Sequence, residues 1–145
     1  MEFRKVLWED ANKVAYDLSQ VDRWECDQFV PNVSLTRFIR ASLAASGETW
    51  AMTHEGKTVG LIGIVGETNR AWFMTTETLL AHKREFLKAS REWMAKVNPR
   101  DNLEATFHRD NIPTRRWLRW LGWSERGETR SSSGVPMVTL EWSAT

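Results

Sequence analysis

The sequence predicts one α/β domain over residues 1–145, with a mixed β-sheet and helices on both of its faces. The first observation is the order of hydrophobic patterns, which predict a strand, two helices, three strands, a helix, a strand, a helix and two strands. The second is composition, since 41% hydrophobic and 27% charged residues in a chain of 145 are typical of one globular domain with a sizeable core. The third is that the sequence contains no internal repeat and no linker-like segment.

The first third of the chain predicts a strand and two helices. The strand covers residues 3–7, and a helix follows over about residues 8–19, because its apolar residues recur on one face. Residues 22–33, which include Pro31, are predicted to be irregular. Ser34 is typical of an N-cap, and Gly47 is typical of the end of a helix. The apolar stripe between them is formed by Leu35, Phe38, Ile39 and Leu43.

The rest of the chain alternates between strands and helices. Two strands at 48–53 and 58–65 flank a hairpin turn at 54–57, in which Gly56 supplies the unusual backbone angle. The remaining strands are predicted at 71–75, 103–107, 123–128 and 137–142, with a flexible turn at 131–134. The remaining helices are predicted at 79–97, where Asn98-Pro99 stops the helix, and at 111–121.

Charge and cysteine content narrow the classes of function. The net charge of +1 gives no overall field that would favour nucleic acid or an anionic membrane. Cys26 is the only cysteine, which excludes an intramolecular disulfide and fits a reducing compartment. No apolar run reaches the length of a signal peptide or of a membrane-spanning helix, so we expect a soluble, intracellular protein. No zinc spacing, phosphate-binding loop, dinucleotide fingerprint or Ser-His-Asp order is present, and we predict no metal.

Tryptophan is unusually frequent, with nine Trp against one Tyr. Tryptophan combines a large contact area with an N–H donor that needs a partner. Two interpretations remain open, which are a Trp-rich core and a Trp-rich docking surface.

Residues 111–123 carry the most specific pattern of the sequence, Asn-Ile-Pro-Thr-Arg-Arg-Trp-Leu-Arg-Trp-Leu-Gly-Trp. A strand-like run at 103–107 precedes it. The stretch 111–123 resembles the last signature block of the GNAT acyltransferases. The residues in register with that block are Asn111, Thr114, Trp117, Gly122 and Trp123. Leu118 stands where the family carries its tyrosine acid. The resemblance implies a mixed, mostly antiparallel sheet of six to seven strands.

The same resemblance implies acetyl-CoA as cosubstrate and a set of residues that bind it. The backbone at the end of the fourth strand, at Phe73, Met74 and Thr75, would hold the pantetheine arm, which Asn111 would orient. The family's pyrophosphate loop is rich in glycine, whereas this chain has His82, Lys83 and Arg84. These side chains could hold the phosphates in place of the backbone. The alternative is that they form a solvated helix face.

The resemblance assigns no catalytic residue. Acetyl transfer needs an acid for the leaving thiolate and usually a base for the amine. Leu118 cannot donate a proton, and Tyr16 is expected to pack on the first helix. The candidate acids are Cys26, His108 and Thr75, and the candidate bases are Glu25, Asp27 and Glu67. For each base the alternative is a plain surface carboxylate, and for His108 it is a structural histidine.

Arginine and tryptophan interleave in the last third of the chain, at Arg109, Arg115, Arg116, Trp117, Arg119, Trp120, Trp123, Arg126 and Arg130. Three interpretations stay open: Trp117 and Leu121 in the core with arginines on the solvent side, a surface for coenzyme A or an acidic protein, and a single-strand nucleic-acid surface. Nucleic acid is the least favoured of the three.

Three segments, 71–76, 83–88 and 116–122, resemble the small GNAT-like proteins of short-tailed bacteriophages, which are related to the internal-core assembly protein of that phage type. The resemblance implies a phage-encoded acetyltransferase-like protein that acts on a host or phage protein in the host cytoplasm, and it also allows association with the virion. The rival function is a catalytically weak or inactive GNAT-fold binding module that modulates a host enzyme, or a virion assembly factor.

Overall fold

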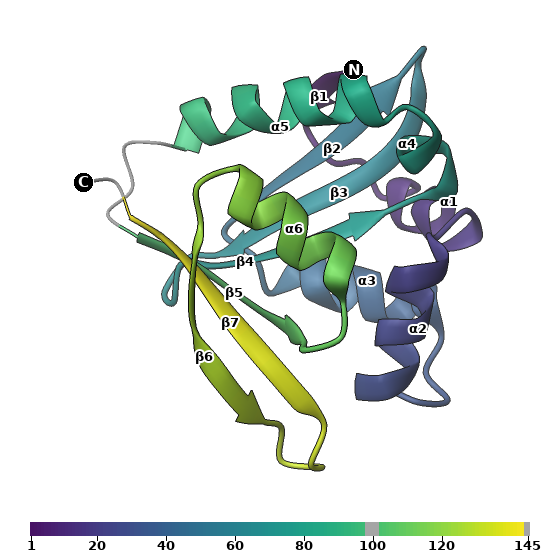
Figure 1. Ribbon diagram of the computed structural model, residues 1–145. Coiled ribbons are helices and arrows are strands. Elements are labelled where there is room, and N and C mark those ends of the chain that lie inside the picture. The colour runs from purple at the N-terminus through teal and green to yellow at the C-terminus, as the bar shows by residue number, and fades with distance from the viewer. Residues whose placement is uncertain (98–101, 144–145) are drawn as a thin grey trace.

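The computed structural model describes residues 1–97 and 102–143 of the chain. Within these residues the strands form one seven-stranded sheet in the order β1-β2-β3-β4-β5-β7-β6 (Figure 1). The strands are β1 (Glu2–Arg4), β2 (Glu48–His54), β3 (Lys57–Val65), β4 (Arg70–Thr75), β5 (Asn102–His108), β6 (Ser124–Arg130) and β7 (Pro136–Ser143). All neighbouring strands are antiparallel except β4 and β5, which confirms the predicted mixed, mostly antiparallel sheet.

Helices cover both faces of this sheet. The helices are α1 (Asp10–Tyr16), α2 (Gln20–Phe29), α3 (Leu35–Ala44), α4 (Glu77–Ala81), α5 (Lys83–Val97) and α6 (Ile112–Trp120). Figure 1 shows α5 and α6 in front of the sheet and α3 behind it. Among the described residues, no helix is both long and apolar enough to cross a membrane.

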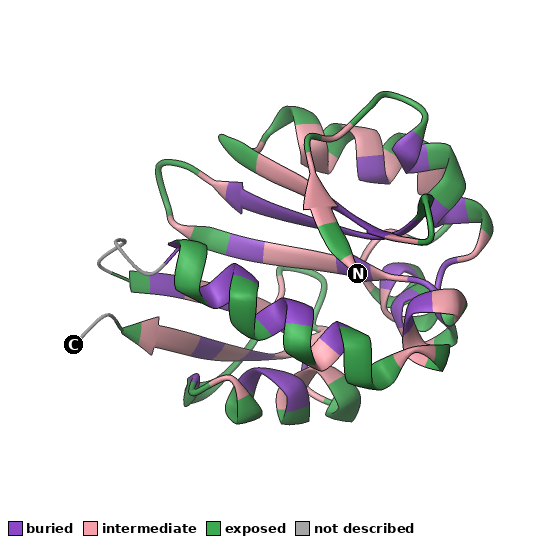
Figure 2. Ribbon diagram, turned by 90° about the horizontal axis from the view of Figure 1, so that it is seen from above, coloured by how far each residue is buried: buried purple, intermediate pink, exposed green. Residues whose placement is uncertain are grey.

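Strand alternation divides the core into two layers. Ile62 and Ile64 of β3 face α5 and α6, whereas Leu61, the residue before Ile62, packs with α1 and α3. Figure 2 shows the buried stretches on the central strands and on the helix sides that face them. The layer under α5 and α6 contains Trp93, which is fully buried.

The tryptophans divide between the two interpretations that the sequence left open. The buried members are Trp93, Trp117 and Trp123. Their rings surround Phe73, with centroid distances of 5.8, 4.8 and 6.4 Å. Trp8, by contrast, is 71% exposed, with the Arg40 guanidinium 4.1 Å from the centre of its ring. The core interpretation therefore holds for part of the set only.

Helix α2 corrects the prediction that residues 22–33 are irregular. Ser19 caps this helix, because its hydroxyl accepts the backbone N–H of Asp22. The helix ends at Phe29, two residues before Pro31, so the proline marks the end of a helix rather than an irregular segment.

The predicted helix 79–97 is interrupted at His82. Thr76 caps a short first helix, α4, and its hydroxyl accepts the N–H of Leu79. Asp17 holds the start of α4, since its backbone oxygen accepts from Glu77 and its carboxylate accepts from the N–H and hydroxyl of Thr78. These contacts fix the direction of α4 independently of α5. The stop predicted at Asn98-Pro99 lies outside the described residues.

The parallel pair β4 and β5 positions the site. These strands share a single register pair, Arg70 opposite Glu104, and diverge beyond it. Their diverging ends are met by the N-terminal part of α2 and by Asn111, the N-cap of α6.

Candidate active site

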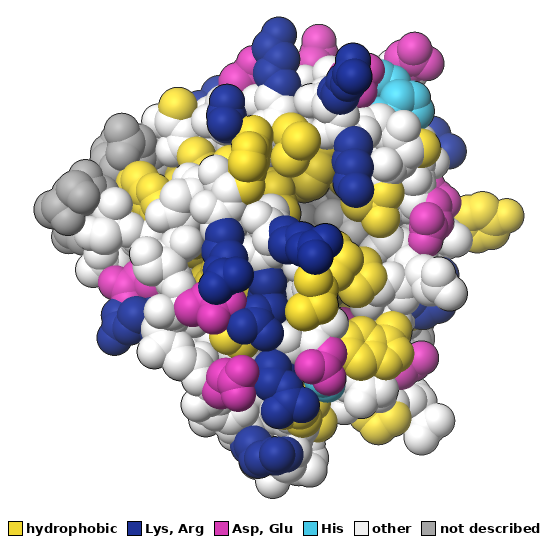
Figure 3. Space-filling model, viewed as in Figure 1, with side chains coloured by type: hydrophobic (Ala, Val, Ile, Leu, Met, Phe, Trp, Pro, Cys, Tyr) yellow, Lys and Arg dark blue, Asp and Glu magenta, His cyan; other side chains and the backbone are white. Residues whose placement is uncertain are grey.

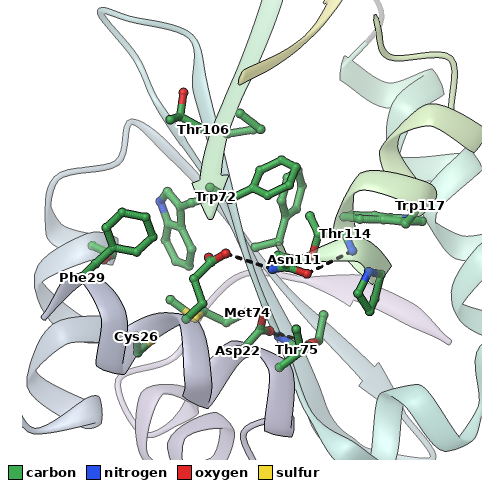
Figure 4. A pocket seen from close by; sticks show the side chains of 18 of the residues that line it. Asp22, Cys26, Phe29, Trp72, Met74, Thr75, Thr106, Asn111, Thr114 and Trp117 are labelled. Atoms are coloured by element: carbon green, nitrogen blue, oxygen red, sulfur yellow. Dashed lines mark hydrogen bonds between the residues drawn. The ribbon is translucent and has the colours of Figure 1, made fainter. Parts of the chain in front are cut away.

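A cavity of about 520 Å³ lies at the gap between β4 and β5. Its lining comes from both faces of the sheet: Phe38 and Ser42 of α3 on one side, and Leu80, Phe86 and Trp117 on the other. Figure 4 shows Phe29 and Trp72 on one side of Asn111 and Trp117 on the other. The cavity therefore connects the two faces of the sheet at the point where the strands separate.

Trp72 forms part of the wall toward α3. Its indole lies over Gly63 of β3, where an added Cβ would come within 2.3–2.5 Å of the ring. The indole N–H donates to the hydroxyl of Ser46 at 2.8 Å. Glycine at 63 is thus required for this close approach, and the hydrogen bond fixes the ring in the cavity wall.

Glu25 of α2 lines the same cavity and is half-buried. Its Oε1 accepts the backbone N–H of His108 at 2.9 Å and the side-chain amide of Asn111 at 3.0 Å. Burial raises the pKa of this carboxyl to about 7, and the charge of Asp22 adds to the shift, while the two hydrogen bonds oppose it. Glu25 therefore changes protonation close to neutral pH.

Asn111 connects Glu25 to the start of α6. Its Nδ2 donates to Glu25, and its Oδ1 accepts the backbone N–H of Thr114 at 3.2 Å. The side chain is almost completely buried. One amide thus caps a helix and orients a carboxylate, which explains why asparagine suits this position.

Asp22 attaches α2 to the end of β4. Its Oδ2 accepts the backbone N–H of Thr75 at 2.7 Å and the hydroxyl of Thr75 at 2.6 Å. The backbone N–H of Ser19 donates to the carbonyl of Thr75 at 2.9 Å. Burial raises the pKa of Asp22, and the hydrogen bonds from Thr75 and Ser19 oppose this shift.

The structure separates the residues expected to bind the cosubstrate. Phe73, Met74, Thr75 and Asn111 line the cavity. The backbone donor and acceptor of Thr75 are occupied by Asp22 and Ser19. Backbone groups of alternate strand residues point to the same side, so those of Phe73 also point away from β3 and toward β5.

The basic triplet 82–84 lies outside the cavity lining. His82 packs against His54 with the rings tilted and their centroids 4.1 Å apart, and its Nδ1 is 2.9 Å from the carbonyl of Thr78. Lys83 and Arg84 begin α5, are exposed, and have no ion-pair partner among the described residues. Leu80 and Phe86, on either side of the triplet in sequence, do line the cavity. The triplet therefore lies beside the end of the cavity that Leu80 and Phe86 line, rather than within the cavity.

Only some of the candidate acids and bases reach the cavity. Asp27 and Glu67 are exposed and do not line it. Cys26 does, but burial raises the pKa of its thiol to about 12. His108 is buried against Trp24, 4.5 Å between ring centroids, and its Nδ1 accepts the N–H of Asp110.

Two expectations about the missing tyrosine acid are wrong. Tyr16 does not pack on α1, since it is 91% exposed at the end of that helix. Leu118 does not lie on the helix face next to the site, since it is fully buried in the core. The residues of α6 that line the cavity are Pro113, Thr114 and Trp117.

Sequence reasoning missed Asp22 and the aromatic residues Phe29 and Trp72 as parts of the site. Ser19 and Asp22 have the spacing of a capping box, which would have predicted the start of α2. Once α2 is known, Glu25 and Phe29 fall on the same face as Asp22. Among the described residues, no group of three His, Cys, Asp or Glu could hold a metal ion.

Figure 3 shows Lys and Arg side chains spread over the face that α5, α6 and the β6–β7 hairpin form. Many of these cations are paired. Arg115 and Arg119 both contact Glu125, and Arg126 contacts Glu141. Trp120 is covered by the Arg91 guanidinium, 4.0 Å from its ring centre. With Trp117 buried, this region agrees best with a core helix that carries its arginines on the solvent side.

Several solved structures of acetyltransferases have a similar fold. An acetyltransferase of the GNAT family from Bacillus anthracis aligns with a TM-score of 0.67 at 15% identity, over 98% of this chain and 93% of that one. The ribosomal-protein-S18-alanine N-acetyltransferase of Escherichia coli gives a TM-score of 0.65 at 11% identity, over 99% and 94%. The ribosomal-protein-S5-alanine acetyltransferase of Vibrio fischeri gives 0.64 at 14%, over 98% and 92%.

At these identities the likeness establishes the fold. The chain has the GNAT fold over its described length, as the sequence predicted. No family model and no curated protein matches the chain.

Proposed function

We propose that this protein transfers an acetyl group from acetyl-CoA to a primary amine of a protein. The observation that carries the proposal is the cavity between the diverging β4 and β5, with Glu25 in its wall. A cavity that connects both faces of the sheet lets two substrates approach one another from opposite sides. Holding two reactants in this way is itself a large part of catalysis.

Glu25 is proposed as the general base. The amine nitrogen attacks the thioester carbonyl, the C–N bond forms, and the C–S bond breaks. The ionised Glu25 carboxylate takes the proton of the attacking amine. A pKa of about 7 suits this task, because a base is most effective when its pKa is near the working pH.

The pantetheine arm is proposed to pair with the backbone of Phe73, since the backbone of Thr75 is occupied by Asp22 and Ser19. Met74 and Asn111 would line its path. The pyrophosphate would meet the side chains of His82, Lys83 and Arg84 beside the cavity. The start of α4 offers little backbone to a phosphate, because Asp17 already accepts the N–H groups of Glu77 and Thr78.

No tyrosine is proposed as the acid. The thiolate of coenzyme A, with a free-thiol pKa of roughly 8.5, leaves unprotonated or takes its proton from water. The reaction then rests on positioning and on the base, so turnover is expected to be slow compared with an enzyme that has both groups.

The acceptor is proposed to be a host or phage protein. This part rests on the resemblance of segments 71–76, 83–88 and 116–122 to GNAT-like proteins of short-tailed bacteriophages. The protein is then proposed to act in the host cytoplasm. Association with the virion is a further possibility under the same resemblance.

Calorimetric titration of the purified protein with acetyl-CoA tests the cosubstrate directly. The Lys83→Glu, Arg84→Glu double variant should weaken binding at least about tenfold, or 1.4 kcal/mol. The matched control is Lys5→Glu with Lys13→Glu, which makes the same charge change at exposed residues outside the cavity lining. Absence of binding heat at millimolar acetyl-CoA would refute the proposal.

Glu25→Gln tests the base. At pH 8 this variant should lose at least about 10²-fold in kcat/KM while acetyl-CoA affinity stays unchanged. In the unmodified protein, kcat/KM should rise as the pH passes about 7, since the base must be ionised. A variant with full activity at pH 8 would remove Glu25 from the mechanism.

A second function is favoured by the contacts at the end of β4. Ser19 and Asp22 occupy the backbone of Thr75, and Asp17 occupies the start of α4. These contacts use groups that a cosubstrate could otherwise bind, which favours a binding module with weak or no catalysis. Capture of a host or phage protein by a form that does not bind acetyl-CoA would support this function.

A further inference from the structure

The cavity has a distinct end on the side of α2 and α3, which we call the acceptor chamber and define by Asp22, Glu25, Phe29, Phe38 and Trp72. Three of these residues are aromatic, and Trp72 is held in place by Gly63 and Ser46. Such walls suit a bulky apolar group, because its removal from water is favourable and a fixed ring does not need to be reordered.

The Glu25 carboxylate keeps one oxygen for a ligand, and the buried Asp22 carboxylate lies beside it on α2. Both hydrogen bonds to Glu25 go to Oε1, and both bonds from Thr75 to Asp22 go to Oδ2. Among the described residues, no hydrogen bond reaches the second oxygen of Glu25, whereas the Ser19 hydroxyl also contacts the Asp22 carboxylate. The two residues are one helical turn apart on α2, so a single ammonium group can approach both.

The chamber continues onto a polar face of the sheet. Thr106 of β5, Thr139 and Met137 of β7 and Thr129 of β6 also line the cavity. Several of these side chains are only half-buried, because the helices of this face pack against β2, β3 and β4. The hydroxyls of Thr106 and Thr139 lie 2.9 Å apart and can exchange hydrogen bonds with a peptide backbone.

From this arrangement we infer that the acceptor is the N-terminal amine of a polypeptide whose first side chain is bulky and apolar. The amine lies between Asp22 and Glu25, the first side chain fills the aromatic walls, and the following residues run across Thr106 and Thr139. The inference rests on the proposed acetyl transfer and specifies the substrate of that same site.

The choice of an N-terminal amine over a lysine side chain also follows from proton transfer. A base with a pKa of about 7 is matched more closely to an α-ammonium group, with an ordinary pKa of about 8, than to a lysine ammonium, with an ordinary pKa of about 10.4. A small arylalkylamine would fill the aromatic walls but leave the threonine face unused.

Matched octapeptides test the inference. Three peptides have a free N-terminus and begin with Phe, Leu or Gly. A fourth begins with Phe but has a blocked N-terminus and an internal Lys. Phenethylamine is tested beside them as a small-molecule acceptor. Acetyl transfer is followed by thiol release, and mass spectrometry locates the acetyl group. Peptide binding is measured separately by calorimetry in the presence and absence of acetyl-CoA.

The Phe and Leu peptides should exceed the Gly peptide at least about tenfold in kcat/KM, with the acetyl group on the α-amine. Phe29→Ala should reduce this preference to near unity, and Phe29→Leu should retain most of it. Trp8→Ala, which removes an exposed aromatic ring outside the cavity lining, should leave the preference unchanged. Circular dichroism confirms that each variant is folded.

Acetylation of the internal lysine, equal rates for the three free peptides, or a preference for phenethylamine would each overturn the inference while the proposed acetyl transfer stands. Binding of the Phe peptide without any acetyl transfer would instead support the chamber and count against the transferase. Absence of both peptide binding and acetyl-CoA binding would overturn both.

Discussion

Thr75 donates twice to one oxygen of Asp22, through its backbone N–H at 2.7 Å and its hydroxyl at 2.6 Å. This relationship attaches the first turn of α2 to the end of β4, 53 residues further along the chain. It also determines which backbone groups of β4 remain available to a ligand. The same contact therefore serves both the fold and the proposed chemistry.

Thr75→Val should destabilise the protein. Valine keeps the shape of the side chain and the backbone N–H but removes the hydroxyl that donates to Asp22. Loss of one hydrogen-bond donor to a buried carboxyl should lower the free energy of unfolding by about 1–3 kcal/mol. Urea unfolding measures this change. Thr68→Val is the control, because the Thr68 hydroxyl is exposed and its contact with Val65 is long, at 3.5 Å. Equal stability of the two variants would contradict this account.

The protein should lose stability between pH 4.5 and about 7 through Glu25. In this range the unfolded carboxyl has lost its proton and the folded one still holds it, so rising pH favours unfolding. The stability that the protonated Glu25 contributes is fully present below pH 4.5 and is lost above the pKa of Glu25 in the folded protein, about 7. The loss amounts to at most about 3 kcal/mol.

Glu25→Gln isolates this contribution, because the raised pKa of Asp22 acts in the same direction in both proteins. Urea unfolding at pH 5 and pH 8 should show a smaller decrease for the variant than for the unmodified protein. Parallel pH profiles would mean that the pKa of Glu25 is not raised.

Leu118→Tyr should destabilise the fold rather than restore a catalytic acid. Leu118 is fully buried in the core beneath α6, and tyrosine there would be overpacked and would need a partner for its hydroxyl. We expect a loss of about 1–3 kcal/mol and a lower melting temperature. Leu121→Tyr, at a half-buried position of the same segment, should have a much smaller effect. A stable and more active Leu118→Tyr protein would return this residue to the site.

Gly122→Val should cost about 1–3 kcal/mol through backbone strain. Gly122 follows the end of α6 with φ of 101°, in the left-handed region that favours glycine, and no atom lies close to where a Cβ would be added. Strain is therefore the only expected cost at this position. Gly66→Val serves as comparison, because Gly66 is exposed and has no positive φ. In thermal melts, Gly122→Val should lower the melting temperature more than Gly66→Val. The difference reports the backbone strain at position 122, since both variants replace glycine by valine.

Local signals account for what the sequence predicted well. Ser34 and Asn111 cap α3 and α6 through hydrogen bonds to residues three positions away, which a sequence pattern can reveal. The hairpin between β2 and β3 turns at Glu55 and Gly56, both with positive φ, as the glycine indicated. These features depend only on neighbours along the chain.

The site depends on contacts that no local pattern contains. Asn111 and Glu25 are 86 residues apart in sequence, and the cavity exists because β4 and β5 diverge between them. The split between α4 and α5 depends on Asp17, which directly follows α1 and is 61 residues away from Thr78 in sequence. Likewise, the pattern around residues 111–123 could not tell whether Trp117 or Leu118 faces the cavity, because adjacent helical residues differ in direction by about 100°.

The two tryptophans at opposite ends of the cavity give the protein its own optical probes. Trp72 forms a wall of the acceptor chamber, and Trp117 lies toward α5 against Phe86, 5.1 Å between ring centroids. Indole emission depends on the polarity and mobility of its surroundings, so a ligand at either end should alter the fluorescence of the nearer ring. Replacing one of them by phenylalanine would leave the other as the dominant reporter of the cavity. Acetyl donor and acceptor could then be followed separately, without any attached dye.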